Sequence, residues 1–275
     1  MQPPIVFYHS PCRDGQTAAW VFRRKHPDAD FRKADFGKTP LPADLAGQDV
    51  VLLDFTWPGP EMQQLCQTAR SVLVLDHHAS AEATLRQMAS SYPHVVTAIF
   101  DRSRCGARLT WDYCYANRES PALIDFVEDR DLWRWVLDGS REANACIEQS
   151  PLTWESWDRL ALASREELIA MGRPLLAMQE GIVRRIAAHQ YPATLLGTPV
   201  IACNAPLYQS EVGSLLAHND LIAVVWYHDR DGRYRYSLRS SETGPDVTIL
   251  TQQFGGGGHP HAGGFLADTL VVTPR

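Results

Sequence analysis

The 275-residue chain lacks the features that mark several classes of protein. It carries 26 Lys and Arg against 32 Asp and Glu, a formal net charge of −6, whereas proteins that follow a long nucleic-acid backbone usually have a basic surplus. No window approaches the roughly 20 apolar residues of a membrane-spanning helix. The opening stretch, MQPPIVFYHS, has no basic segment followed by an apolar run. We therefore expect a cytoplasmic protein that binds neither long nucleic acid nor a membrane.

The chain also has no CxxC pair among its six cysteines, which are scattered from Cys12 to Cys203. Scattered cysteines without a secretory context predict reduced thiols rather than disulfides or a structural zinc site. Hydrophobic residues make up 45% of the chain and charged residues 21%, which is the balance of a folded globular protein. The length allows one large domain or two ordinary ones.

Three short apolar runs each end in polar groups. The apolar part of PPIVFYHS ends at His9, that of DVVLLDF ends at Asp54, and that of VLVLDHHAS ends at Asp76. The segments that follow the first two runs, RDGQTAAWVFRRK and PEMQQLCQTARS, have helical composition. Strands that alternate with helices predict βαβ units and a mainly parallel sheet, so the fold class is α/β.

The rest of the chain predicts further helices and a second set of strands. Residues 104–136 are expected to be mostly helical, and residues 165–190 to form a helix with a break near Gly172 and Pro174. Beyond it, TPVIACNA, LIAVVWYHD and YRYSLRS have the pattern of strands. We predict an N-terminal parallel-sheet domain over 1–165, a helical connector over 166–191 and a smaller α/β domain over 192–275.

Polar groups at the carboxyl ends of parallel strands meet at one edge of the sheet, where ligands bind in such folds. Carboxylates crowded there repel one another unless cations intervene, and a set of oxygens and imidazoles suits Mn²⁺, with Mg²⁺ or Fe²⁺ as alternatives. Two ions ~3.5–4 Å apart could polarise a phosphoryl group and activate water. In the triplet Asp76-His77-His78, we expect His77 to ligate, Asp76 to orient it and His78 to face the phosphate. The candidate ligands are His9, Asp14, Asp54, His77 and Asp129.

Five motifs in order along the chain resemble the DHH phosphoesterase family, in the form that has a C-terminal DHHA1 domain. The motifs are HSPCRDG, LLDF, LDHHAS, EDRDLW and GGGGHPHAGGF. Their spacing is most similar to the subgroup of nanoRNases and cyclic-nucleotide phosphodiesterases, within a superfamily that also contains RecJ-type exonucleases and family II inorganic pyrophosphatases. The resemblance implies two metal ions held by the five candidate ligands, with Asp54 as the bridge.

Two positions leave the ligand set open. Many members of the family have an aspartate where this chain has Cys12, and a soft thiolate is a poor ligand for Mn²⁺ or Mg²⁺. The EDRD stretch offers both Asp129 and Asp131, and the sequence does not choose between them.

The glycine run 255–258 predicts a second anion-binding element. Consecutive glycines let backbone N–H groups approach a phosphate, and His259 or His261 could add donors, although such a run could also be a flexible linker. A guanidinium at the end of the preceding strand suits bidentate phosphate binding. The predicted substrate-binding residues are Arg239, Ser240, Gly256, Gly257 and His259.

These inferences favour a phosphodiesterase that cuts short RNA or dinucleotides to nucleoside monophosphates. A cyclic mononucleotide phosphodiesterase, a RecJ-like single-strand exonuclease and a catalytically silent nucleotide-binding protein are the alternatives. The sequence leaves open the metal, the base and length preference, the direction of attack and the oligomeric state, a homodimer included.

Overall fold

The structure is a computed structural model that describes residues 2–116, 118–218 and 220–275. The chain divides into two compact units, Met1–Leu176 and Ala177–Arg275, called here the N-terminal and C-terminal units. Among the described residues, none of the helices combines the length and the apolar character that crossing a lipid bilayer demands.

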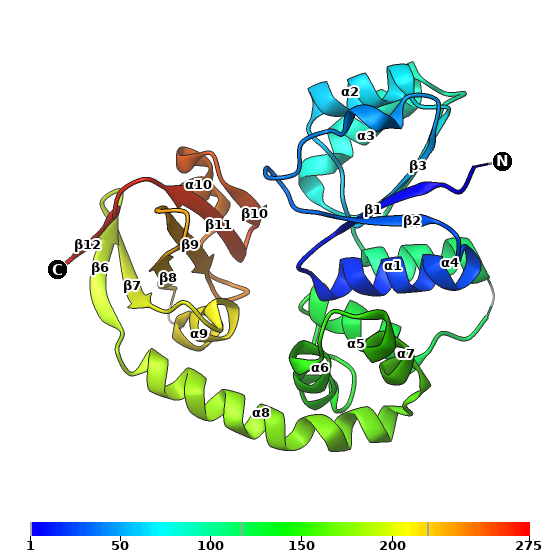
Figure 1. Ribbon diagram of the computed structural model, residues 1–275. Coiled ribbons are helices and arrows are strands. Elements are labelled where there is room, and N and C mark those ends of the chain that lie inside the picture. Colours follow the sequence, from blue (N-terminus) through cyan, green and yellow to red (C-terminus); the bar gives the residue numbers. More distant parts are fainter. Residues whose placement is uncertain (1, 117, 219) are drawn as a thin grey trace. The chain divides into compact units, whose positions relative to one another are not determined.

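The N-terminal unit is built on a parallel sheet in the order β2-β1-β3-β4-β5, of which β1, β2 and β3 are labelled in Figure 1. The three apolar runs of the sequence form β1, β3 and β4, so the predicted parallel sheet is confirmed. β2 and β5 pair with its two edges, also in parallel. The strands are β1 (Ile5–His9), β2 (Asp30–Ala34), β3 (Asp49–Leu53), β4 (Ser71–Asp76) and β5 (Val96–Phe100).

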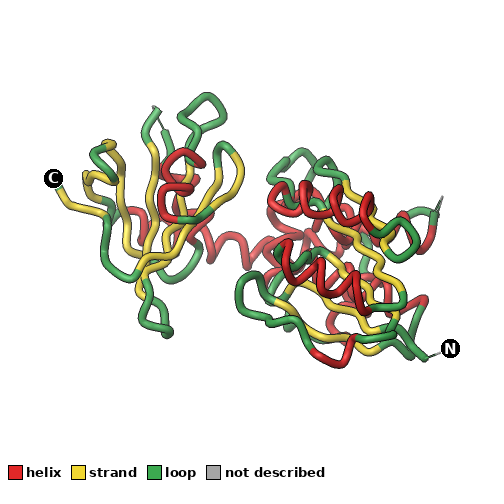
Figure 2. The backbone as a smooth tube through the Cα atoms, turned by 90° about the horizontal axis from the view of Figure 1, so that it is seen from above, coloured by secondary structure: helices red, strands yellow, loops and turns green. Residues whose placement is uncertain are grey.

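Helices cover both faces of this sheet, because alternate strand residues point to opposite sides. Figure 2 shows helices on both sides of these strands. Val6 and Tyr8 of β1 pack in a cluster with α1 and α4, whereas Ile5 and Phe7 pack in another with α2 and α3. The helices of the unit are α1 (Arg13–Lys25), η1 (Ala43–Leu45), α2 (Gly59–Thr68), α3 (Ala79–Ser91), α4 (Gly106–Tyr115), α5 (Ala122–Asp131), α6 (Ser140–Gln149) and α7 (Trp154–Leu162).

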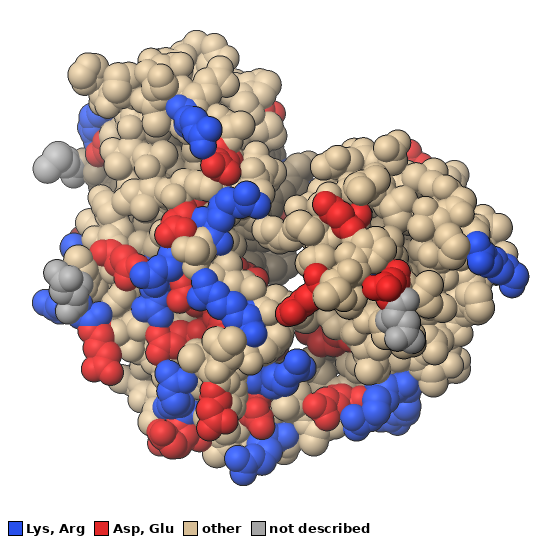
Figure 3. All heavy atoms as spheres, turned by 180° about the vertical axis from the view of Figure 1, so that it is seen from behind, with Lys and Arg blue, Asp and Glu red and all other residues tan. Residues whose placement is uncertain are grey.

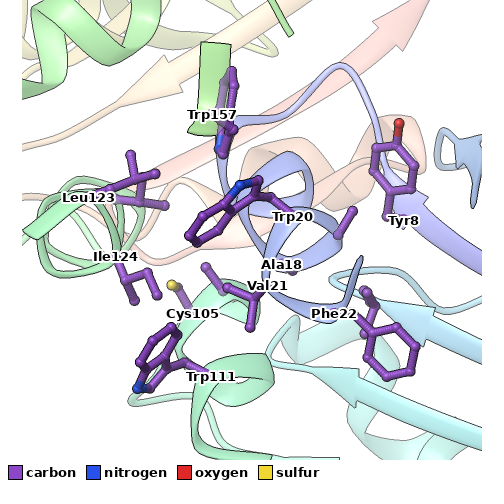
Figure 4. Close-up of a cluster of buried hydrophobic side chains, with 14 of the residues drawn as sticks. Tyr8, Ala18, Trp20, Val21, Phe22, Cys105, Trp111, Leu123, Ile124 and Trp157 are labelled. Atoms are coloured by element: carbon purple, nitrogen blue, oxygen red, sulfur yellow. The ribbon is translucent and has the colours of Figure 1, made fainter. Parts of the chain in front are cut away.

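Two buried tryptophans fix α1 within the larger of these clusters (Figure 4). The indole N–H of Trp20 donates to Asp158 at 2.8 Å, and that of Trp157 donates to Thr17 at 2.8 Å. Each indole is thus packed in the core with its polar atom paired, as buried tryptophans require. This packing holds the first turn of α1, which carries Asp14, beneath the carboxyl edge of the sheet.

The predicted break in the long helix is wrong, because α8 (Arg165–Ala187) runs without interruption through Gly172 and Pro174. Gly172 is needed for close packing instead: a Cβ there would lie 1.6 Å from the carbonyl oxygen of Glu142 in α6. The backbones of α8 and α6 are therefore in direct contact at Gly172. This contact lies two residues before Pro174 and stabilises α8 there.

The C-terminal unit contains a mixed sheet in the order β10-β11-β9-β8-β7-β6-β12, in which β7 and β8 are the parallel pair. The three predicted strands are β7, β8 and β9, and helices on the sheet make the unit α/β. Its elements are β6 (Tyr191–Leu195), β7 (Thr198–Asn204), α9 (Gln209–Leu216), β8 (Ile222–His228), β9 (Tyr234–Arg239), α10 (Thr248–Thr251), η2 (Gln252–Phe254), β10 (Gly257–His259), β11 (Ala262–Ala267) and β12 (Val272–Pro274).

The two glycines of α8 give a matched test of this packing. Gly172→Ala should lower the free energy of unfolding by about 1–3 kcal/mol, because the methyl group would overlap Glu142. Gly181→Ala should leave it unchanged or raise it by up to about 1 kcal/mol, since the nearest atom to a Cβ there lies 4.0 Å away. Urea denaturation followed by tryptophan fluorescence measures both. Equal effects of the two substitutions would contradict the close approach of α8 to α6.

Candidate metal centre

Four of the five candidate ligands, His9, Asp14, Asp54 and His77, gather where the strand order of the N-terminal sheet reverses. The chain goes from β1 outward to β2 on one side and to β3 on the other. Neighbouring loops therefore leave in opposite directions at the carboxyl ends of β1 and β3, and in doubly wound sheets ligands bind at such a point. His9 ends β1, Asp54 follows β3 and Asp76 ends the adjacent β4.

Asp54 lies at the middle of this edge, with only 1% of its surface exposed and a left-handed backbone (φ 54°). One carboxylate oxygen, Oδ1, is 3.2 Å from Nε2 of His77, and the other, Oδ2, is 3.4 Å from Nδ1 of His9. Burial opposes ionisation, but His77 and His9 together hold the pKa of Asp54 below its usual range. Gly106 makes room for it, because a Cβ there would lie 2.6 Å from that of Asp54.

The first group of donor atoms is formed by His9, Cys12 and Asp54, whose ligand atoms lie within 4.8 Å of one another. Nδ1 of His9 is buried and makes no hydrogen bond to any residue that the structure describes. The Cys12 thiol donates to Oδ2 of Asp54 at 3.6 Å, and burial together with the Asp54 charge raises the pKa of Cys12 well above its usual range. Gly15 allows α1 to start here, since a Cβ would meet the His9 carbonyl oxygen at 2.2 Å.

The second group surrounds Nε2 of His77 with carboxylate oxygens from three parts of the chain. Asp54 approaches to 3.2 Å, Asp131 to 3.4 Å and Asp14 to 3.7 Å. Burial works against the imidazolium, but the hydrogen bond to Asp54 and the three negative charges raise the pKa of His77 to about 10. Without a metal, a proton on His77 balances part of this charge.

Asp14 is fixed at the N-terminus of α4. Its carboxylate accepts hydrogen bonds from the backbone N–H groups of Gly106 at 2.6 Å and Ala107 at 2.7 Å. Burial and the charges of Asp54 and Asp131 nevertheless raise the pKa of Asp14 well above its usual range. The cluster is short of positive charge, and hard divalent cations fit this donor set of carboxylates and imidazoles.

The predicted ligand Asp129 does not join the cluster, and Asp131 takes its place. The carboxylate of Asp129 accepts hydrogen bonds from the backbone N–H groups of Val136 at 3.1 Å and Leu137 at 3.4 Å. Asp131 lies two residues further along α5, and its side chain, 26% exposed, faces His77. Asp129 therefore closes the loop after α5, whereas Asp131 supplies an oxygen to the second group.

Asp76 is buried and holds the ring of His78, whereas the prediction gave it the ring of His77. Its carboxylate accepts hydrogen bonds from the backbone N–H groups of both histidines and from Nδ1 of His78 at 2.7 Å. Burial opposes the shift, but Asp76 and Asp54 raise the pKa of His78 to about 9. Nδ1 of His78 is thus occupied by Asp76, and in the protonated ring Nε2 is the second donor.

Sequence reasoning missed two residues at this site. Gly106 begins α4 in the stretch RCGARL, and its lack of a side chain leaves room for the carboxylates of both Asp14 and Asp54. Phe36, in the loop after β2, packs its ring against His9 and His78. A glycine at the start of a helical pattern was the available signal for Gly106, whereas a single aromatic residue in a loop gives no comparable signal.

The predicted substrate residues lie in the C-terminal unit, described here by itself. The Arg239 guanidinium donates to Ser237 and Ser210 hydroxyls and to the Leu238 carbonyl, and burial lowers the pKa of Arg239. It lies close to α9, because a Cβ on Gly213 would meet its Cγ at 2.8 Å. Ser240 contacts Nδ1 of His261 at 3.0 Å. Arg239 is therefore held by internal partners on several sides.

The glycine run forms part of an edge strand rather than a free loop. Gly257 and His259 begin and end β10, and both are exposed. The N–H groups of Gly255 and Gly256 donate to Gln252 and Thr251, so these two are already used within the unit. Gly256 also lies against β11, where a Cβ would meet the carbonyl oxygen of Gly264 at 2.3 Å.

Known proteins share this architecture. The DHH domain of a protein described as a member of a family of ribosomal proteins aligns with a TM-score of 0.58 at 12% identity, over 99% of this chain and 83% of that one. The pGpG-specific phosphodiesterase PggH from Vibrio cholerae aligns with a TM-score of 0.51 at 11% identity, over 96% and 92%. The chain thus has the fold of DHH-domain proteins, and the resemblance drawn from its motifs is confirmed at the level of the fold.

A sequence relative exists in a giant virus. An uncharacterized protein of Acanthamoeba polyphaga mimivirus is 25% identical over 96% of this chain and 67% of its own length. No model of a protein family matches the chain.

The neighbouring aspartates of α5 allow a direct test of the ligand assignment. Asp131→Asn should weaken Mn²⁺ binding by at least about tenfold, because it removes the negative charge of a carboxylate that faces His77. Asp129→Asn should leave the affinity within a few-fold but destabilise the protein by about 1–3 kcal/mol, since it weakens the bonds that close the following loop. Calorimetric titration and thermal melting of the metal-free variants measure the two effects. The reverse pattern would return the ligand role to Asp129.

The charge balance around His77 makes metal binding depend on pH. With its pKa raised to about 10, His77 is protonated at neutral pH, and an ion must displace that proton. The Mn²⁺ affinity should therefore rise by about tenfold per pH unit from pH 6 to 9, or more steeply if a second proton leaves. Calorimetry in two buffers of different ionisation enthalpy counts the protons released. An affinity independent of pH over this window would contradict the protonated state of His77.

Proposed function

We propose that the protein is a metal-dependent phosphodiesterase that hydrolyses short oligoribonucleotides or dinucleotides to nucleoside monophosphates. The observation that carries the proposal is the position of Asp54, whose two carboxylate oxygens face two separate groups of donor atoms. Such a carboxylate suits a bridge between two divalent ions, with Mn²⁺ as the first choice and Mg²⁺ or Fe²⁺ as alternatives.

The side chains divide into two sets on either side of this bridge. His9 and Cys12 would complete one site, and Asp14, His77 and Asp131 the other. Bound ions would neutralise a phosphate group and lower the pKa of an attacking water. A thiol is a weak ligand for Mn²⁺, so the site beside Cys12 should bind its ion with the lower affinity of the two sites.

His78 is the residue best suited to contact the substrate. Asp76 fixes its ring through Nδ1, and its side chain remains 29% exposed, more than those of His9 and His77. A protonated imidazole there can donate from Nε2 to a phosphate oxygen. His78 would in this way orient the scissile phosphate through Nε2 while it keeps its hydrogen bond to Asp76 through Nδ1.

Two further observations support a short substrate. The neighbour PggH is described as specific for pGpG, a dinucleotide, although the likeness to it is one of fold. On the face shown in Figure 3, Lys and Arg side chains are interspersed with Asp and Glu rather than gathered in a continuous basic band. Binding a long polynucleotide relies on many phosphate contacts to cationic side chains, whereas a dinucleotide needs few.

The proposal is tested by incubation with Mn²⁺ and a panel of substrates. The panel contains the dinucleotide pApA, RNA chains of five and 25 nucleotides, cyclic AMP and inorganic pyrophosphate. We expect pApA and the pentamer to be cut to monophosphates with kcat/KM at least equal to that for the 25-mer. Asp54→Asn should lower kcat by roughly three orders of magnitude, because it alters the carboxylate that faces both groups.

The exposed Asp44→Asn provides the matched control, since its side chain is 57% exposed and pairs with Arg32 at the surface. It should retain wild-type activity. Preference for the 25-mer with a steep loss of affinity in salt would support a RecJ-like exonuclease instead, and exclusive cleavage of cyclic AMP a cyclic mononucleotide phosphodiesterase. Metal binding without turnover of any substrate would leave the silent nucleotide-binding protein.

A further inference from the structure

An exposed aromatic ring lies at the rim of the candidate metal centre. The Phe36 ring is 4.7 Å from that of His9 and 5.0 Å from that of His78, measured between centroids. On another side it packs against Phe55 at 5.1 Å. Phe36 nevertheless keeps 36% of its surface exposed, although Phe55 beneath it is buried and the side chains of His9 and His78 are only 21% and 29% exposed. The apolar surface that remains open is thus next to the charged cluster.

The loop that carries Phe36 is held in one shape by its own hydrogen bonds. The backbone N–H of Asp35 donates to the Thr39 hydroxyl at 2.8 Å, and the N–H groups of Lys38 and Thr39 donate back to the Asp35 carbonyl. Lys38 forms an ion pair with the Asp35 carboxylate at 2.7 Å. The indole of Trp57 donates to the Thr39 carbonyl at 2.9 Å. A loop closed in this way presents its aromatic ring with little entropy left to lose on binding.

The position of Phe36 fits one chemical class of ligand. A substrate at this site must bring a phosphate to the divalent ions that the imidazoles and carboxylates would hold, and a flat, apolar group to the exposed ring beside them. A nucleotide has both, because its base is a planar π system a few bonds from its phosphate. Stacking on an aromatic side chain is how proteins bind bases of single strands without selecting their sequence.

We propose that Phe36 contacts the substrate and stacks on the base of a nucleotide whose phosphate is bound at the cluster of Asp54, His77 and His78. This inference rests on the proposed function, which it deepens by assigning the recognition of the base to one residue. Because every base presents a π face, the contact should favour nucleotides over other phosphodiesters while discriminating weakly among the four bases.

A purely structural role for Phe36 has a different consequence. If the ring only positioned His9 and His78, its loss would affect every phosphodiester equally, whether or not the substrate has a base. Substrates with and without bases therefore separate the two roles. The matched pair is pApA and the same phosphorylated ribose dimer without its two bases.

The test measures kcat and KM of wild type, Phe36→Leu and Phe36→Trp with both compounds at saturating Mn²⁺. Phe36→Leu should raise KM for pApA by roughly 5- to 100-fold, the range expected for one lost base stack, and leave KM for the base-free dimer within twofold. Phe36→Trp, which keeps an aromatic face, should restore KM for pApA. Tyr113→Leu, at an exposed aromatic residue on α4, should change neither.

Binding gives a second readout that does not depend on turnover. Calorimetry with analogues of pApA and of the base-free dimer in which a methylene group replaces the scissile bridging oxygen, so that they cannot be hydrolysed, should show the same 5- to 100-fold loss for Phe36→Leu with the first and no loss with the second. Equal losses with both dimers, or no loss with either, would overturn the stacking role while leaving the proposed function in place. If wild type binds the analogue but cuts neither dimer, the phosphodiesterase assignment fails and the binding comparison still decides the role of Phe36.

Discussion

The carboxylate of Asp54 imposes the central constraint on the N-terminal unit. It is buried, it lies on a residue with a left-handed backbone, and both of its oxygens face imidazole nitrogens. Aspartate tolerates this backbone conformation better than most residues, yet it remains costly unless the surroundings enforce it. Here the backbone N–H of Asp54 continues the pairing with β4, by donating to the Leu75 carbonyl at 2.9 Å, and Gly106 leaves the space that the side chain needs.

Several features of the fold serve to bring negative charge next to Asp54 and keep it there. Asp14 is held by the first N–H groups of α4, and Asp131 sits in the last turn of α5. These carboxylates would repel one another in a buried site without compensating cations, which is the condition under which carboxylates bind divalent ions. The apolar packing around Trp20 and Trp157 stabilises the fold against this repulsion.

The sequence predicted those parts of the site that depend on residues next to one another in the chain. Apolar runs that end in His9, Asp54 and Asp76 predicted both the parallel strands and the edge at which the donors meet, since strand direction alone decides where such ends lie. The choice between Asp129 and Asp131 could not be made this way. It depends on which carboxylate of α5 turns back to the following loop, a tertiary contact that spacing does not encode. The same holds for Arg239, because one of its partners, Ser210, lies 29 residues earlier in the chain on α9.

The dispersed origin of the ligands has a consequence for the folding equilibrium. The two donor groups combine atoms from the end of β1, the residue before α1 and its first turn, the residues after β3 and β4, and the last turn of α5. An ion bound by them would act as a cross-link between distant segments of the chain, and only the folded chain offers the complete set. By mass action, ion at 100 times its dissociation constant adds about 2.7 kcal/mol to the free energy of unfolding. The supply of metal in its surroundings would thus regulate how much of the protein is folded, before any substrate is bound.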